Sequence, residues 1–186
     1  MLEIKGLTKK YNNVPVVKKI NFCVMEGEIL GYLGANGAGK STTIKMLAGL
    51  IEPSEGHIYI DGKDITDDLV AYKKRIGYIP EQSELYNHLS GREYLQLVGR
   101  LRQIDEDALD KKINGLMEQL GMSVDMYLPI SNYSKGMKQK VLIAGAMLHN
   151  PDILLLDEPL TGLDITTTLL YKDILDDGSI GRITLG

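Results

Sequence analysis

"GANGAGKSTT" (residues 34–43) follows a short apolar stretch, ILGYL (residues 29–33), and precedes residues with helical spacing. The segment fits the pattern G-x-x-x-x-G-K-[ST], with Gly34, Gly39, Lys40 and Ser41 in the fixed positions. A flexible glycine-rich turn is the alternative interpretation. The strand before the loop and the helix after it favour a loop that binds phosphate, because this motif requires both neighbours.

The residue types of this loop suit a nucleoside triphosphate. Glycines allow successive backbone N–H groups to curl around phosphate oxygens without a Cβ clash, and the following helix adds its first amides and a partial positive charge. Lys40 supplies an ammonium for the β- and γ-phosphates, and Ser41 supplies a hydroxyl for Mg²⁺. The predicted ATP-binding residues of the loop are Gly34, Asn36, Gly37, Ala38, Gly39, Lys40, Ser41 and Thr42.

Composition and charge set the broad class of the chain. It has 186 residues, 44% of them hydrophobic, and we expect one substantial core with a small appended subdomain. The net charge of −4 gives no electrostatic reason to expect nucleic acid as a partner. Cys23 is the one cysteine, so the chain has no internal disulfide. We see no signal peptide and no run of about 20 apolar residues, and therefore expect no direct membrane insertion.

The order of sequence patterns predicts an α/β core interrupted by helices. Alternating strands dominate the first 80 residues, whereas residues 83–137 carry two amphipathic helices, the first opened by the capping-box pattern SGRE (residues 90–93). A further helix is expected over residues 138–149. The run DILLLDEP then predicts a central parallel strand. We expect residues 1–82 and 138–186 to form the ATP-binding core and residues 83–137 to form a helical subdomain.

Two adjacent acids, Asp157 and Glu158, end that apolar strand. Neighbouring strand residues point to opposite faces, so the two carboxylates can have different roles. Asp157 suits a position beside Mg²⁺, and Glu158 suits the polarisation of the water that attacks the γ-phosphate. Two solvated acids in a turn before Pro159 are the alternative. We predict Lys40 and Glu158 as the catalytic residues.

The segment NYSKGMKQK (residues 132–140), together with the loop and the acid pair, resembles the nucleotide-binding domain of ATP-binding cassette (ABC) transporters, closest to the drug- and antibiotic-export branch. The resemblance covers residues 2–164. It implies a P-loop NTPase fold of the α/β class: a RecA-like core with an N-terminal antiparallel β-subdomain and an inserted helical subdomain. It also implies ATP hydrolysis coupled to export, with ATP and Mg²⁺ as cofactors.

Further roles follow from this resemblance. Tyr11 matches the aromatic residue that stacks on adenine, and Asp164 in LTGLD matches the loop that passes between subunits. The residues that match the signature, which faces the ATP of the opposite subunit, are Ser134, Lys135, Gly136 and Met137. The family therefore implies a homodimer with ATP sandwiched at its interface. It also implies a separate membrane permease subunit and a cytoplasmic location at the inner face of the cell membrane, with residues 82–89 as the expected permease contact.

The chain departs from the general family pattern in three places. The signature Leu-Ser-Gly-Gly-Gln is replaced by Tyr-Ser-Lys-Gly-Met, starting at Tyr133. Where the family has a metal-binding Gln, this chain has Glu81 followed by Gln82, and either could face Mg²⁺ beside Ser41 and Asp157. No histidine follows Asp164, although the family has a γ-phosphate-sensing His there. A nucleotide-binding module with little turnover is therefore one alternative function, and a non-transport ABC ATPase is another.

Overall fold

The structure is a computed structural model that describes residues 1–81, 85–157 and 181–185, the last five as backbone only. These residues fall into two compact units: residues 1–80, 152–157 and 181–185 form the first, and residues 81 and 85–151 form the second. The boundary expected at residue 138 falls inside helix α5 (Lys135–Met147), and the whole of this helix belongs to the second unit.

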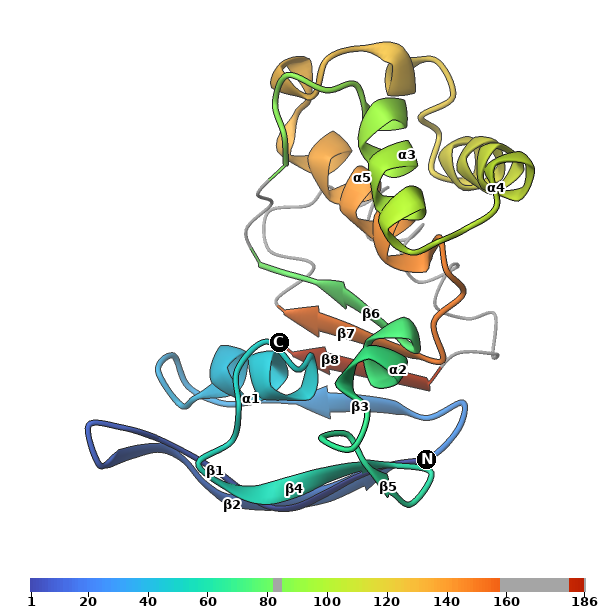
Figure 1. Ribbon diagram of the computed structural model, residues 1–186. Coiled ribbons are helices and arrows are strands. Elements are labelled where there is room, and N and C mark those ends of the chain that lie inside the picture. The colour runs from blue at the N-terminus through green and yellow to red at the C-terminus, as the bar shows by residue number, and fades with distance from the viewer. Residues whose placement is uncertain (82–84, 158–180, 186) are drawn as a thin grey trace. The chain divides into compact units, whose positions relative to one another are not determined.

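An antiparallel sheet forms one layer of the first unit (Figure 1). Its strand order is β2 (Val14–Val24), β1 (Leu2–Tyr11), β4 (Glu55–Ile60) and β5 (Lys63–Asp64). Asn12 and Asn13 join β1 to β2 with φ of 49° and 64°, which is the left-handed backbone of a two-residue type I′ turn. The expected antiparallel subdomain is thereby confirmed.

A parallel sheet forms the second layer of this unit. Its strand order is β3 (Ile29–Tyr32), β8 (Gly181–Leu185), β7 (Ile153–Asp157) and β6 (Ile76–Ile79). All five residues of β7 are buried and the strand is paired on both sides, as its apolar sequence predicts. Because parallel strands share one direction, β3 enters the glycine loop at the same edge of the sheet at which β7 ends in Asp157.

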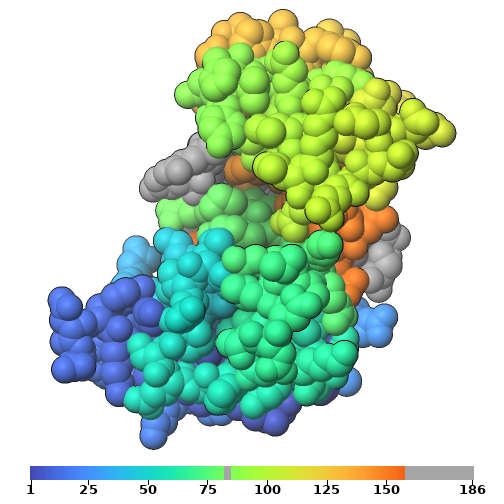
Figure 2. All heavy atoms as spheres, viewed as in Figure 1, coloured from blue at the N-terminus to red at the C-terminus, as the bar shows by residue number. Residues whose placement is uncertain are grey.

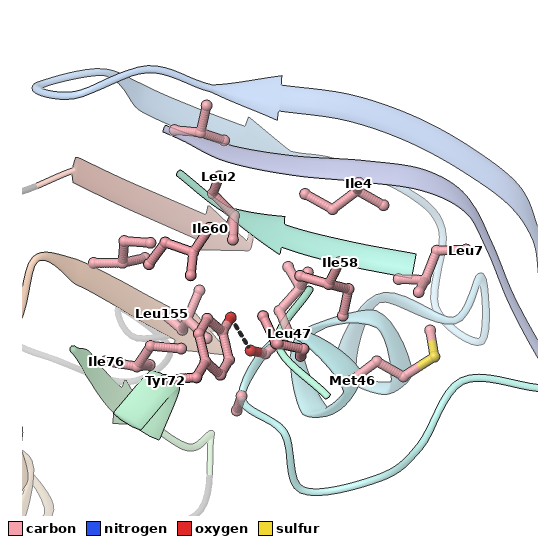
Figure 3. Close-up of a cluster of buried hydrophobic side chains, with 14 of the residues drawn as sticks. Leu2, Ile4, Leu7, Met46, Leu47, Ile58, Ile60, Tyr72, Ile76 and Leu155 are labelled. Carbon is pink, nitrogen blue, oxygen red and sulfur yellow. Dashed lines mark hydrogen bonds between the residues drawn. The ribbon is translucent and has the colours of Figure 1, made fainter. Parts of the chain in front are cut away.

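The core of the first unit lies between these sheets and two short helices, α1 (Lys40–Leu47) and α2 (Leu69–Lys74). Figure 3 shows Leu2, Ile4 and Ile58 of the antiparallel sheet facing Leu47 of α1 and Tyr72 of α2. Tyr72 is 2% exposed, and its hydroxyl donates a 2.6 Å hydrogen bond to the Leu47 carbonyl. This bond satisfies a polar group that burial would otherwise make costly.

The second unit is helical. It consists of α3 (Gly91–Leu101), α4 (Glu106–Gln119), α5 and two short 3₁₀ turns, η1 (Asp125–Tyr127) and η2 (Ile130–Asn132). α3 and α4 pack together, and their side chains lie against each other on the face shown in Figure 2. The predicted capping box is present, with Ser90 and Glu93 exchanging hydrogen bonds at the start of α3. None of the helices in the described parts of the chain has the length and hydrophobicity that a membrane span requires.

Candidate nucleotide-binding site

The glycine loop connects β3 to α1 and owes its shape to a left-handed backbone. Gly37 has φ of 80° and Gly39 has φ of 87°, values that only glycine adopts at little cost. Gly39 is the N-cap of α1, and its carbonyl accepts hydrogen bonds from the amide (2.8 Å) and the hydroxyl (3.0 Å) of Thr43. The first amides of a helix have no partner within it, and no side chain of the cap residue bonds them here, which suits phosphate binding.

Lys40 closes the loop on itself. Its side chain is 7% exposed, and Nζ donates a 2.7 Å hydrogen bond to the carbonyl of Gly34 at the start of the loop. Lysine is rarely so buried unless its charge is compensated. The ammonium thus lies inside the loop, where phosphate oxygens can replace or join the carbonyl as acceptors.

Ser41 and Asp157 meet at the edge of the parallel sheet. The Ser41 hydroxyl donates a 3.1 Å hydrogen bond to Oδ1 of Asp157, whose side chain is 2% exposed. Among the described residues, no group of three or more His, Cys, Asp or Glu could hold a metal by itself. The Ser41 hydroxyl and the Asp157 carboxylate fit Mg²⁺, which usually takes one or two protein oxygens and completes its shell with water and substrate phosphates.

The β1–β2 hairpin packs against the glycine loop. A Cβ atom on Gly39 would lie 2.8 Å from the Val16 carbonyl oxygen and 2.9 Å from Cγ2 of Val17, so β2 contacts the loop where α1 begins. Tyr11 ends β1 in this hairpin and is 49% exposed, with the Lys9 ammonium 5.4 Å from its ring centroid. Tyr11 therefore presents an accessible ring on an element that packs against the loop.

The signature residues lie at the start of α5. Ser134 is the N-cap, and its side chain accepts a 3.2 Å hydrogen bond from the amide of Met137. Ser134 and Lys135 are exposed, whereas Gly136 and Met137 are half-buried. The helix begins three residues before the expected position 138, because the Ser134 cap starts it at Lys135.

The structure brings together only part of the predicted site. Lys40, Ser41 and Asp157 converge in the first unit. Glu81 is exposed and belongs to the second unit. The predicted residues Gln82, Glu158 and Asp164 lie outside the described part of the chain.

Sequence reasoning missed the contacts that support these groups. Val16 and Val17 pack against Gly39, the Lys9 ammonium lies 5.4 Å from the ring centroid of Tyr11, and Tyr133 hydrogen-bonds to neighbouring segments. The alternation of β2 indicated a half-buried strand. Nothing in the sequence indicated that the loop packs against it.

The strand–loop–helix unit, with an acid at the end of another parallel strand of the same sheet, defines a P-loop NTPase domain. The profile of the ABC transporter family matches residues 17–161, and the chain belongs to this family. It is 40% identical over 163 residues to the ABC transporter ATP-binding protein NatA of Bacillus subtilis, covering 87% of this chain and 66% of that protein. It is 38% identical over 165 residues to the bacitracin transport ATP-binding protein BcrA of Enterococcus faecalis, covering 88% of this chain and 52% of that protein.

Solved structures share this fold. The ATP-binding subunit of an ABC transporter superposes with a TM-score of 0.91 at 33% identity, covering 100% of this chain and 78% of that one. An ATP-binding cassette solved as a dimer in a post-hydrolysis state with ADP and Pi superposes with a TM-score of 0.88 at 25% identity, covering 100% of this chain and 87% of that one. The chain spans about half to two thirds of the length of the curated relatives it matches.

Proposed function

We propose that this chain binds ATP with Mg²⁺ at the glycine loop and hydrolyses it as the ATP-binding subunit of an ABC-type exporter. The observation that carries the proposal is the hydrogen bond between Ser41 and Asp157. It joins the hydroxyl of the loop to a buried carboxylate across the edge of the parallel sheet. A glycine-rich turn without a nucleotide role would have no need of an acid at this position.

Each group of the first unit has a defined task in this function. The amides at the start of α1 and the Lys40 ammonium bind phosphate oxygens, and Lys40 stabilises charge that develops on the β- and γ-phosphates. Ser41 and Asp157 would hold Mg²⁺, which would supply positive charge to offset the charge of the phosphates. Tyr11 stacks on the adenine, and the hairpin that carries it packs against the loop at Gly39.

Hydrolysis additionally needs a water and a second copy of the chain. We assign Glu158 to the orientation and polarisation of the attacking water. Ser134 lies at a helix N-terminus, which favours an anion, and we assign it to the γ-phosphate bound by the partner copy. The dimeric cassette solved with ADP and Pi supports this arrangement, and Asp164 would lie near the interface.

Transport requires a partner that crosses the membrane. NatA and BcrA are described as ATP-binding proteins of transport systems, and the linearmycin resistance ATP-binding protein LnrL of Bacillus subtilis is 35% identical over 164 residues. These relatives support coupling to a membrane permease and favour export of an antibiotic-like compound. Residues 82–89 are the proposed contact with the permease, at the inner face of the cell membrane.

The Lys40→Ala variant tests the site. We expect the full-length variant to lose ATP–Mg²⁺ binding or phosphate release, because the loop loses its buried ammonium. Calorimetric titration with ATP–Mg²⁺ and a phosphate-release assay measure the two steps. Lys45→Ala is the matched control, since Lys45 is exposed on the same helix. Unchanged ATP affinity and turnover in Lys40→Ala would refute the site assignment.

A further inference from the structure

Tyr133 lies immediately before the signature serine and is buried, with 6% of its surface exposed. Its hydroxyl makes two hydrogen bonds: it donates to the Asp125 carbonyl at 2.7 Å and accepts from the amide of Gly91 at 3.2 Å. Burial raises the pKa of this hydroxyl above its ordinary value. The side chain of Tyr133, two residues before α5 begins, therefore links the start of α3 to the turn η1.

Backbone hydrogen bonds reinforce this link. The amide of Ile130 donates to the Leu89 carbonyl at 2.8 Å, and the amide of Ser131 donates to the Asn87 carbonyl at 3.0 Å. Ser90 and Pro129 form an isolated antiparallel bridge. Residues 87–90 and 129–131 thus run side by side, and the Tyr133 hydroxyl adds a contact to Gly91, where α3 begins.

The N-termini of two helices are fastened at this point. Ser90 is the N-cap of α3 and Ser134 is the N-cap of α5, and the residue next to each cap takes part in the Gly91–Tyr133 hydrogen bond. α3 and α5 pack together, as Figure 1 shows for this unit. The orientation of α5 at its N-terminus therefore depends on the hydrogen bonds of Tyr133 as well as on the Ser134 cap.

The absence of a side chain at Gly91 leaves room for the Tyr133 hydroxyl. A Cβ atom on Gly91 would lie 2.6 Å from the Tyr133 oxygen, so only glycine at this position leaves room for the hydrogen bond. A leucine, the residue of the general signature pattern, has no hydroxyl and would leave the Gly91 amide without this acceptor. The departure at Tyr133 thus supplies two polar contacts that the general pattern lacks.

We propose that Tyr133 is a positioning residue, which holds the start of α5 so that Ser134 and Gly136 reach the nucleotide bound by a second copy of the chain. The inference rests on the proposed function, because Ser134 has this task only in an ATP-bound dimer. Tyr133 itself is buried and touches no nucleotide. Its effect is on the geometry of the residues that follow it.

The test compares Tyr133→Phe with Tyr72→Phe in the full-length protein assembled with its permease. Both tyrosines are buried and donate a hydrogen bond to a backbone carbonyl, but Tyr72 lies in the first unit. We expect similar losses of thermal stability in the two variants. Only Tyr133→Phe should lower kcat, by about 10- to 100-fold, because small misplacements of a group that acts in the transition state have effects of this size. KM for ATP should change by less than about twofold, since the glycine loop is intact.

Gly91→Ala is a second variant that displaces the hydroxyl from the opposite side, and it should reproduce the low kcat with the tyrosine still present. An unchanged kcat in both Tyr133→Phe and Gly91→Ala, with normal ATP binding by the wild-type protein, would overturn this inference and leave the proposed function standing. An equal fall of kcat in Tyr72→Phe would also overturn it. A wild-type protein that does not bind ATP would overturn the proposed function, and this inference with it.

Discussion

The hydroxyl of Ser41 donates a 3.1 Å hydrogen bond to Asp157, a residue 116 positions later in the chain. The two meet because β3 and β7 are parallel strands of one sheet, and both end at the edge where the glycine loop lies. Ligands of open parallel sheets bind beyond the carboxyl ends of the strands. The contact therefore brings together the two proposed Mg²⁺-binding residues from segments that lie far apart in the sequence.

Asp157→Asn should weaken ATP–Mg²⁺ binding by about 10- to 100-fold, the usual range for an outer ligand of a metal site. Asparagine keeps the shape and the acceptor oxygen for Ser41, so the substitution removes mainly the charge. Calorimetric titration with ATP in the presence of Mg²⁺ measures the effect. The same titration with EDTA is the control, and there the variant should match the wild type. An equal loss with and without Mg²⁺ would show that Asp157 supports the loop and not the metal.

The glycine loop and the central strand were predictable from the sequence, because each is encoded in a short stretch. The spacing of Gly34, Gly39 and Lys40 defines the loop, and the uninterrupted apolar residues of β7 indicate a strand covered on both faces. Neither prediction needs knowledge of contacts distant in the sequence. Both are confirmed.

The contacts that hold the site residues in position were not predictable, since they join residues distant in the chain. The hydrogen bond between Gly91 and Tyr133 spans 42 positions, and glycine and tyrosine are both common at unrelated places. Residues from 138 onward were expected in the ATP-binding core, whereas the whole of α5 belongs to the second unit. All residues from Val141 to Ala146 are buried, and an apolar run of this kind does not indicate which neighbouring elements cover it.

Gly39→Ala should destabilise the loop. A left-handed backbone costs a non-glycine residue about 1–3 kcal/mol, and the new Cβ would also collide with the Val16 carbonyl. We therefore expect a lower unfolding free energy in denaturant titration, together with weaker ATP binding. Gly115→Ala is the control: Gly115 lies within α4 with no atom within 4 Å of a new Cβ, so alanine should stabilise by about 0.5–1 kcal/mol. Normal ATP affinity in Gly39→Ala would contradict the proposed role of this glycine.

Ser134→Ala and Ser90→Ala form a matched pair, because each serine caps the N-terminus of a helix in the same unit. Each substitution should lower the unfolding free energy by about 0.5–2 kcal/mol. Ser134→Ala should in addition abolish ATP-dependent dimerisation, which sedimentation or light scattering measures. Ser90→Ala should dimerise normally. If the two variants dimerise equally well, Ser134 acts only as a helix cap.

Tyr11→Ala should weaken ATP binding through the loss of base stacking. Stacking on an aromatic side chain contributes about 1–3 kcal/mol per base, which corresponds to a loss of about 5- to 150-fold in affinity. Tyr11→Phe keeps the ring and should bind ATP like the wild type, because the proposed contact uses the ring face and not the hydroxyl. Inorganic triphosphate separates the two parts of the site: it contacts the loop but has no base, so Tyr11→Ala should bind it normally. A loss of triphosphate affinity equal to the loss of ATP affinity would mean that the substitution disturbs the hairpin against Gly39, and that Tyr11 does not stack on adenine.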